Sequence, residues 1–188
     1  MGGTAPAVAD RRARFETVFD AAYVPVQRYV RRRGGGDETD DVVAETFTVV
    51  WRRIDEVPDS AVVPWCLGVA RRCLSNQRRS TVRRKRLRDR VAAEPQTHEV
   101  STTDLDLEVA LARLDEEQRE VLRLSAWEGF GAGEIAQVLG ITPNAASIRL
   151  HRARRDLAVL LESGETSGKK SVDGGHTSVE AETERRER

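Results

Sequence analysis

Apolar residues recur at intervals of three and four along most of the chain, and this spacing restricts the fold more than any other feature of the sequence. Near the N-terminus the series is Phe15, Phe19, Ala22, Val26 and Tyr29. Residues spaced in this way share one face of an α-helix. The chain is therefore predicted to be all-α, with a kink or a split in this first helix at Pro25, which lacks a backbone N–H.

Two more amphipathic helices are predicted before residue 90. After a glycine turn at residues 34–36, the acids of Asp37–Asp41 suit a helix N-terminus, where exposed N–H groups favour negative charge. The apolar stripe of that helix is Val43, Phe47, Val50, Trp51 and Ile54. Pro64 then suits the first turn of a third helix, and the inward face of this helix is Trp65, Val69 and Cys73.

A strongly basic segment follows that third apolar face. Residues 71–90 carry ten basic side chains and one acidic side chain. The whole chain balances 31 basic against 31 acidic residues, but residues 1–90 carry a formal charge of +7 and residues 91–188 carry −7. A dense positive run favours a polyanionic partner, of which nucleic acid is the commonest. On charge alone, the solvated end of a helix explains the run equally well.

The second half begins with another helical series, formed by Leu107, Leu111 and Leu114. Asp115 and, three residues later, Gln118 predict a capping box at the start of the next helix. The inward positions of that helix are Val121, Leu122 and Leu124.

Residues 131–161 have the sequence pattern of a helix-turn-helix. One helix carries Ile135, Ala136 and Leu139 and ends at Gly140, which can take the left-handed conformation of a C-cap. Ile141 lies in the turn, Thr142 caps the next helix, and Pro143 occupies its first turn. A purely structural helical hairpin remains the alternative for this segment taken alone.

The phase of the last helix predicts which side chains reach DNA. The predicted inward residues are Ala145, Leu150, Ala153 and Leu157, and the outward ones are Asn144, Ser147, Ile148, His151 and Arg152. An exposed isoleucine among polar residues suits contact with thymine methyl groups in a major groove. Arg149, Arg154 and Arg155, nearer the edge or end of the helix, are predicted to contact phosphates.

Glycine, proline and small polar residues divide the chain into two modules, a linker and a tail. The predicted boundaries are 12–91 for the first module, 92–104 for a flexible linker, 105–162 for the helix-turn-helix module and 163–188 for the tail. The tail has only Val172, Val179 and Ala181 as apolar side chains, too few to offset the entropy lost on ordering. It is predicted to be disordered.

Several functional classes are poorly supported by the sequence. Cys66 and Cys73 lie seven residues apart and are predicted to be small, half-buried core residues. Together with the scattered His98, His151 and His176 they form no zinc-binding set, and no nucleophile or carboxylate pair has catalytic spacing. We therefore expect no enzyme activity, no metal and no cofactor. The sequence has no apolar run long enough to span a membrane and no signal peptide at its start, so a cytoplasmic location is expected.

Both halves together resemble the extracytoplasmic-function sigma factors of bacterial RNA polymerase. The resemblance covers roughly residues 12–162 and rests on four segments in this order: YVPVQRYV, DDVVAETFTVVWRRI, PWCLGVARRCLSNQRRSTVRR and LARLDEEQREVLRLSAWEGFGAGEIAQVLGITPNAASIRLHRARRDL. It implies that the first module binds core RNA polymerase and the −10 promoter element, and that the second reads the −35 element. An anti-sigma factor is a further candidate partner.

The resemblance also implies specific contacts. In the −10 region it points to Arg71, Arg72, Asn76, Arg78, Arg79 and Arg83, and the loop of residues 55–63 is where the family holds an extruded base. The polymerase-binding surface would include Asp40, Asp41, Glu45 and Arg52. At −35 the contacts would come from Asn144, Ser147, Ile148, Arg149, His151, Arg152, Arg154 and Arg155.

Two other functions remain compatible with these residues. A stand-alone helix-turn-helix regulator would bind duplex DNA without polymerase. A pure interaction protein, such as a decoy for polymerase, would bind the same partners without directing initiation.

Overall fold

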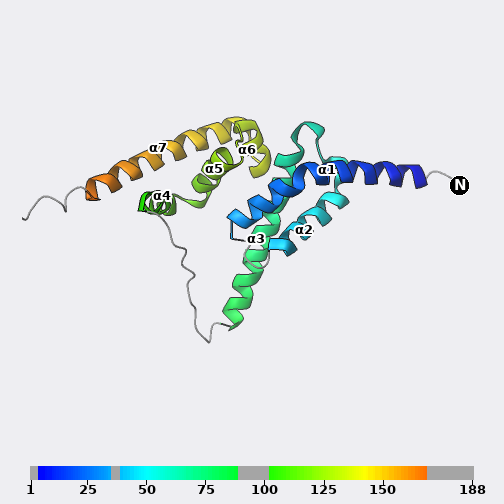
Figure 1. The fold of residues 1–188 in the computed structure, drawn as a ribbon, viewed down its shortest axis with the longest axis horizontal. Helices are drawn as coiled ribbons and strands as arrows, with labels where there is room; N and C mark the ends of the chain where they lie inside the picture. Colours follow the sequence, from blue (N-terminus) through cyan, green and yellow to red (C-terminus); the bar gives the residue numbers. More distant parts are fainter. Residues whose placement is uncertain (1–3, 35–38, 89–101, 169–188) are drawn as a thin grey trace, which may run out of the picture.

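The computed structural model describes residues 4–34, 39–88 and 102–168, and within these ranges it contains helices and no strand, which confirms the all-α prediction (Figure 1). The first module contains α1 (Thr4–Arg32), α2 (Thr39–Arg52) and α3 (Val62–Arg88). Two short 3₁₀ turns, η2 (Ile54–Glu56) and η3 (Asp59–Ala61), join α2 to α3. The second module contains α4 (Thr102–Arg113), α5 (Glu116–Trp127), α6 (Ala132–Leu139) and α7 (Pro143–Gly168).

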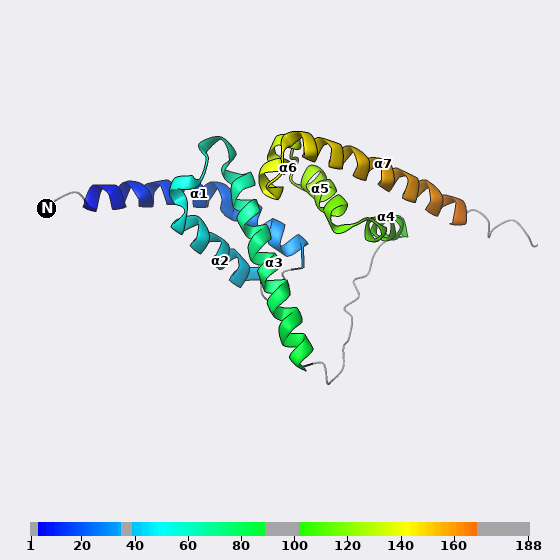
Figure 2. The same cartoon turned by 180° about the vertical axis from the view of Figure 1, so that it is seen from behind.

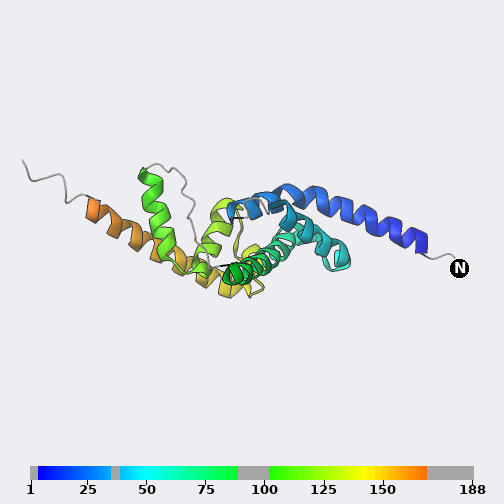
Figure 3. The ribbon, with the colours of Figure 1, turned by 90° about the horizontal axis from the view of Figure 1, so that it is seen from below.

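Helix α1 bends along its length but continues unbroken through Pro25 (Figures 1 and 3). Of the two predicted alternatives, a kink or a split at Pro25, the split is therefore wrong. A proline inside a helix costs about 3 kcal/mol when nothing compensates. Here Ala22 and Val26 on either side are completely buried in the core of the first module, and this packing keeps the backbone helical.

The core of the first module follows the predicted faces, with differences at Trp51, at Ile54 and at the two cysteines. Val43, Phe47 and Val50 are buried, but Trp51 remains 38% exposed. Ile54 is completely buried although it lies in η2, because α2 ends at Arg52 and the chain turns there. Cys66 and Cys73 are 0% and 3% exposed, so the expectation of half-buried thiols is wrong and both belong to the core.

The basic segment is helical as far as Arg88, and its end projects away from the rest of the molecule (Figure 2). The helices extend beyond the predicted module boundaries at several places. Helix α1 begins at Thr4, before the expected start at residue 12, and α4 begins at Thr102, inside the expected linker. Helix α7 continues to Gly168 rather than stopping at 162, because each residue added to an existing helix forms one more backbone hydrogen bond and no proline stops it. The rest of the expected linker and tail lies outside the described residues.

The two modules contact each other, which the sequence did not predict. Helix α6 packs against α3, and one cluster of buried apolar residues extends from the first module into the second. A Cβ placed on Gly68 of α3 would lie 3.4 Å from the backbone oxygen of Val138 in α6. A glycine at this point therefore allows the two helices to approach closely.

Candidate nucleic-acid interface

The helix-turn-helix of the second module forms as its sequence predicts. Gly140 ends α6 in the left-handed conformation, with φ of +68°. The Ile141 N–H donates to the Ala136 oxygen at 3.0 Å, which closes the turn. The Thr142 hydroxyl accepts a hydrogen bond from the Ala145 N–H at 3.2 Å and caps α7. These contacts fix the angle at which α7 leaves α6.

The buried face of α7 differs from the prediction by one residue at its start. Ala146, Leu150 and Ala153 are buried, whereas Ala145 is only half-buried, and Leu157 is also half-buried. The observed positions recur at intervals of four and three, so they form one continuous stripe. A stripe that began at Ala145 would not continue at these intervals. The prediction that Ala145 is an inward residue is therefore wrong.

The outward face of α7 is exposed as predicted. Its members are Asn144, Ser147, Ile148, His151 and Arg152. Ile148 is 44% exposed, which is unusual for a β-branched apolar residue surrounded by polar ones. A protein helix of this kind fits into the major groove of DNA with such residues facing the base edges.

The arginines of α7 separate into two groups by their contacts. Arg149 pairs with Glu117 at 2.9 Å, Arg154 donates to Ser125 at 3.0 Å, and Arg155 pairs with the neighbouring Asp156 at 3.0 Å. Within the described residues, the Arg152 side chain has no hydrogen bond or ion pair. Among the arginines of α7 that the structure describes, Arg152 is thus the one whose guanidinium makes no contact within the protein that would compete with a contact to DNA.

The predicted −10 residues lie on α3, where Arg71, Arg72, Asn76, Arg78 and Arg79 are exposed. Arg79 donates to the Ser75 oxygen and to Asn76, so these side chains form a local polar surface. Arg78 instead donates to the backbone oxygen of Arg33 at 2.6 Å. Arg83 lies further along α3, and its side chain is outside the described set.

Two arginines that the sequence analysis missed hold the segment between α2 and α3. Arg11 of α1 donates to the oxygens of Trp51 and Arg52, at 2.9 and 3.1 Å. Arg14 donates to the oxygen of Val57 at 2.6 Å and to that of Ile54 at 3.3 Å.

These bonds satisfy the carbonyls of Trp51, Arg52 and Val57 at the ends of α2 and η2, whereas the Ile54 oxygen also accepts a hydrogen bond from the Val57 N–H at 3.3 Å. Each arginine also pairs with an exposed acid of the segment, Arg11 with Asp55 at 3.5 Å and Arg14 with Asp59 at 3.0 Å. The spacing of three between Arg11 and Arg14 was the available signal, because it places both side chains on one face of α1.

The predicted polymerase-binding residues are all exposed on α2. They are Asp40, Asp41, Glu45 and Arg52. The half-exposed ring of Trp51 lies near the C-terminal end of the same helix, edge-on to Phe15 with 5.2 Å between ring centroids. An exposed tryptophan beside exposed charges is typical of a protein-binding surface.

The described part of the chain holds no cluster of three or more histidine, cysteine or acidic residues arranged to bind a metal ion. Among the described helices, none is long and apolar enough to cross a membrane.

Comparison with known proteins identifies relatives of this chain. Residues 104–157 match the family model for region 4 of sigma-70. The chain is 31% identical over 175 residues to the ECF RNA polymerase sigma factor SigL of Mycobacterium tuberculosis, covering 86% of this chain and 97% of that protein.

Two solved structures are also similar. The sigma factor RpoE of Bartonella quintana, solved in complex with the anti-sigma factor NepR, matches with a TM-score of 0.60 and 23% identity, over 79% of this chain and 96% of that chain, and shows the same fold. CnrH in complex with the cytosolic domain of CnrY matches with a TM-score of 0.53 and 25% identity, over 79% of this chain and 88% of that one.

Proposed function

The chain belongs to the extracytoplasmic-function family of RNA polymerase sigma factors, and from this premise we propose how its helices divide the work of promoter recognition. As a member of this family, it binds core RNA polymerase and directs initiation at specific promoters. A stand-alone regulator does not account for similarity over 97% of a sigma factor.

The outward face of α7 carries the proposed recognition of the −35 element, and it is the observation on which the proposal rests. Ser147, Ile148 and Arg152 lie within about one and a half turns of one another on an exposed helix whose entry is fixed by a capped turn. Isoleucine suits a thymine methyl group, and an arginine without a competing partner suits the O6 and N7 atoms of guanine. Arg149, Arg154 and Arg155, each already paired within the module, suit phosphates.

The first module supplies the proposed contacts at −10 and to polymerase. An unpaired DNA strand needs a cationic track for its phosphates and a shaped pocket for an extruded base. The arginine face of α3 suits the track, and the segment between α2 and α3, held by Arg11 and Arg14, suits the pocket. The exposed acids of α2 and Trp51 suit a site on the polymerase clamp.

These assignments imply a protein that works with DNA and polymerase rather than by bond-making chemistry. Transcription places it in the cytoplasm, and catalytic activity of its own is not expected. The complexes of RpoE with NepR and of CnrH with CnrY support an anti-sigma factor as a regulatory partner of this chain as well.

The decisive experiment is promoter-specific transcription with purified core polymerase, using a library randomised at the −35 element. Arg152→Ala is expected to lose preference at one base pair, by about 1–3 kcal/mol, and to keep the others. Arg155→Ala, the matched control that also removes one guanidinium from α7, is expected to weaken all sequences alike. Unchanged preference in Arg152→Ala would show that Arg152 contacts phosphate, and failure of the wild type to direct initiation would overturn the assignment as a whole.

The −10 track is tested by the salt dependence of complex formation. Replacing Arg72 and Arg79 by alanine is expected to lower the slope of log affinity against log salt by about 2, because each phosphate contact releases counterions. Arg12→Ala, which removes an exposed cation of α1 that pairs with Glu16, is expected to leave the slope unchanged. Equal slopes in the double variant and the wild type would exclude these two arginines from the track.

A further inference from the structure

The first turn of α5 holds the recognition helix α7 at two points. The Glu117 carboxylate pairs with the Arg149 guanidinium at 2.9 Å. The Gln118 side chain donates through its amide nitrogen to the Asp156 carboxylate at 2.7 Å. Both contacts lie within the second module. We call Glu117, Gln118, Arg149 and Asp156 the α7 brace.

The brace lies along the edge between the buried stripe and the outward face of α7. Arg149 and Asp156 are seven residues apart, which is close to two helical turns, so they lie on one line along the helix. Both are half-buried. Arg152 comes about one turn after Arg149 and about one turn before Asp156. The brace therefore holds the helix on either side of the side chain that is assigned to the −35 bases.

Gln118 is fixed through both ends of its side-chain amide group. Its oxygen accepts from the Asp115 N–H at 3.2 Å, which completes the capping box of α5, while its nitrogen donates to Asp156. Glutamate and glutamine both serve in a capping box, but of the two only glutamine has an N–H that can donate to a carboxylate. The contact with α7 therefore uses the part of Gln118 that the cap does not need.

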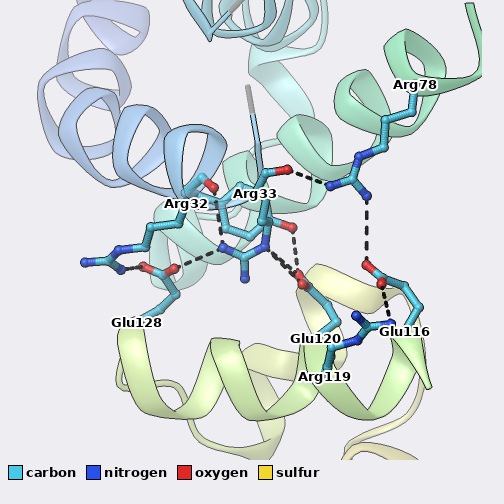
Figure 4. Close-up of polar contacts among 8 residues, drawn as sticks. Arg32, Arg33, Arg78, Glu116, Arg119, Glu120 and Glu128 are labelled. Carbon is cyan, nitrogen blue, oxygen red and sulfur yellow. Dashed lines mark hydrogen bonds and ion pairs between the residues drawn. The ribbon is translucent and has the colours of Figure 1, made fainter. Parts of the chain in front are cut away.

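The acid at the start of α5 makes different contacts. Glu116 pairs with Arg119 at 3.4 Å and lies 3.8 Å from Arg78 of α3 (Figure 4). Glu116 and Gln118 are two positions apart, so they point about 160° apart around the helix. Glu116 therefore faces away from α7, and the printed partners of Glu117 and Gln118 lie on it.

Arg152 adjoins a cavity of 210 Å³ between the start of α5 and α7. The residues that line the cavity are Asp115, Glu117, Gln118, Arg149 and Arg152. Because Arg152 borders on this space rather than on tightly packed side chains, its direction depends on the orientation of α7 as a whole.

A small rotation of α7 would misplace Arg152. A side chain that makes a specific contact has to be held within about 0.5 Å and 10–20° of its productive geometry. The tip of an arginine lies about 8 Å from the helix axis, so a rotation of about 10° moves it by about 1.4 Å. This exceeds the range of about 0.5 Å over which hydrogen-bond lengths vary. Two contacts spaced along the edge of the helix resist such a rotation.

We propose that Glu117 and Gln118 are positioning residues for −35 recognition: the α7 brace fixes the rotation of α7 and thereby the direction in which Arg152 meets the edge of a base pair. The proposal rests on the assignment of α7 to the −35 element. Partly exposed polar contacts contribute little to stability, so the brace is expected to act on sequence preference more than on unfolding.

Two variants break the Gln118 contact with opposite changes of charge. Gln118→Glu keeps a capping-box residue but places a carboxylate against Asp156. Asp156→Ala removes the acceptor and leaves the capping box intact. The first adds a negative charge near the DNA and the second removes one, so the affinity for all sequences is expected to fall in the first and to rise in the second.

The full-length variants are assayed as holoenzyme with core polymerase, on a promoter library randomised at the −35 element. Both are expected to lower the preference at the base pair assigned to Arg152 by at least about threefold, out of the about 5- to 150-fold that a bidentate contact supplies. Preferences at the other −35 positions are expected to stay. Circular dichroism checks that the variants keep their helices.

Matched controls separate position from charge. Glu117→Gln and Glu108→Gln each remove one acid, the first from the brace and the second from the exposed surface of α4. Of these two, only Glu117→Gln is expected to lower the preference. Combining Gln118→Glu with Asp156→Asn exchanges donor and acceptor at the wild-type net charge, and this double variant is expected to regain the preference.

Arg152→Ala distinguishes the brace from the −35 assignment. In that background, Gln118→Glu is expected to have no further effect at the base pair concerned, because the two residues act through one contact. If Arg152→Ala lost the preference while Gln118→Glu and Asp156→Ala kept it, the brace would be overturned and the −35 assignment would stand. An equal loss at every −35 position would also overturn the brace, since a merely structural role predicts that result. If Arg152→Ala itself kept every preference, the assignment of Arg152 to a base would fail.

Discussion

Arg14 provides the sharpest test of how the segment between α2 and α3 is held. Its side chain leaves α1 and donates to the oxygens of Ile54 and Val57, residues that are 0% and 2% exposed. It also pairs with Asp59, whose side chain is 89% exposed. Arg14→Met keeps much of the aliphatic stem and removes both kinds of contact, whereas Asp59→Asn removes only the ion pair.

The two contacts differ in expected size. A hydrogen bond from a charged donor contributes about 1.5–3 kcal/mol when it is shielded from water. Arg14 makes two such bonds, but its side chain is 37% exposed, so water replaces part of each contribution. We expect Arg14→Met to lower the free energy of unfolding by about 2 kcal/mol. An exposed ion pair contributes about 0–1 kcal/mol, so Asp59→Asn is expected to cost less than about 0.5 kcal/mol.

Urea unfolding followed by circular dichroism measures both free energies. The same variants are then assayed for promoter opening, where Arg14→Met is expected to act on the −10 element and to leave −35 preference unchanged. Equal losses of stability in Arg14→Met and Asp59→Asn would refute the reasoning, because the ion pair rather than the carbonyl contacts would then hold the segment.

Two further predictions concern alkaline stability and the turn before α7. Burial raises the pKa of the Cys66 thiol to about 12, whereas an unfolded thiol ionises near about pH 8.5. The unfolded state therefore loses its proton first, and the free energy of unfolding falls between these pH values, by up to about 1.4 kcal/mol per pH unit from this thiol. Burial, reinforced by Glu120, also raises the pKa of Tyr29, which adds to the fall at higher pH. Urea unfolding across this pH range should show a free energy of unfolding that falls less steeply in Cys66→Ala than in the wild type. An equal slope in both would show that the Cys66 thiol does not cause the fall. Gly140→Ala should cost about 1–2 kcal/mol because φ is +68°, whereas Gly133→Ala, with equally open surroundings inside α6, should gain about 0.5–1 kcal/mol. Thermal unfolding measures both, and shifts of the same sign would contradict the argument.

Features that depend on residues close in sequence were predictable. The Asp115 carboxylate accepts from the Gln118 N–H at 2.7 Å, and the Gln118 side chain accepts from the Asp115 N–H at 3.2 Å, as the capping-box pattern indicates. The Gly140 C-cap and the Thr142 N-cap are of the same kind. Each contact spans three or four residues, so the sequence pattern and the geometry carry the same information.

Contacts between distant residues were not predictable in this way. Arg33 is the last of three consecutive arginines, and its sequence context resembles that of an exposed helix end. It is buried because α5, 87 residues later, places Glu120 beside it. In the same way, Arg14 meets Val57 across 43 residues. Hydrophobic periodicity shows which face of a helix is buried but not which helix covers it, so these partners emerge only from the packing of the whole chain.

The opposite charges of the two halves meet in ion pairs between the modules, and these pairs respond differently to salt. The pair of Arg78 with Glu116 is exposed on both sides, so ions at physiological concentration, with a screening length of about 8 Å, weaken it substantially. The pairs of Arg33 lie at the buried centre of the contact, where ions do not reach and screening is small. Salt that weakens the exposed pair of Arg78 with Glu116 therefore leaves most of the buried contact of Arg33 with Glu120 and Glu128 in place.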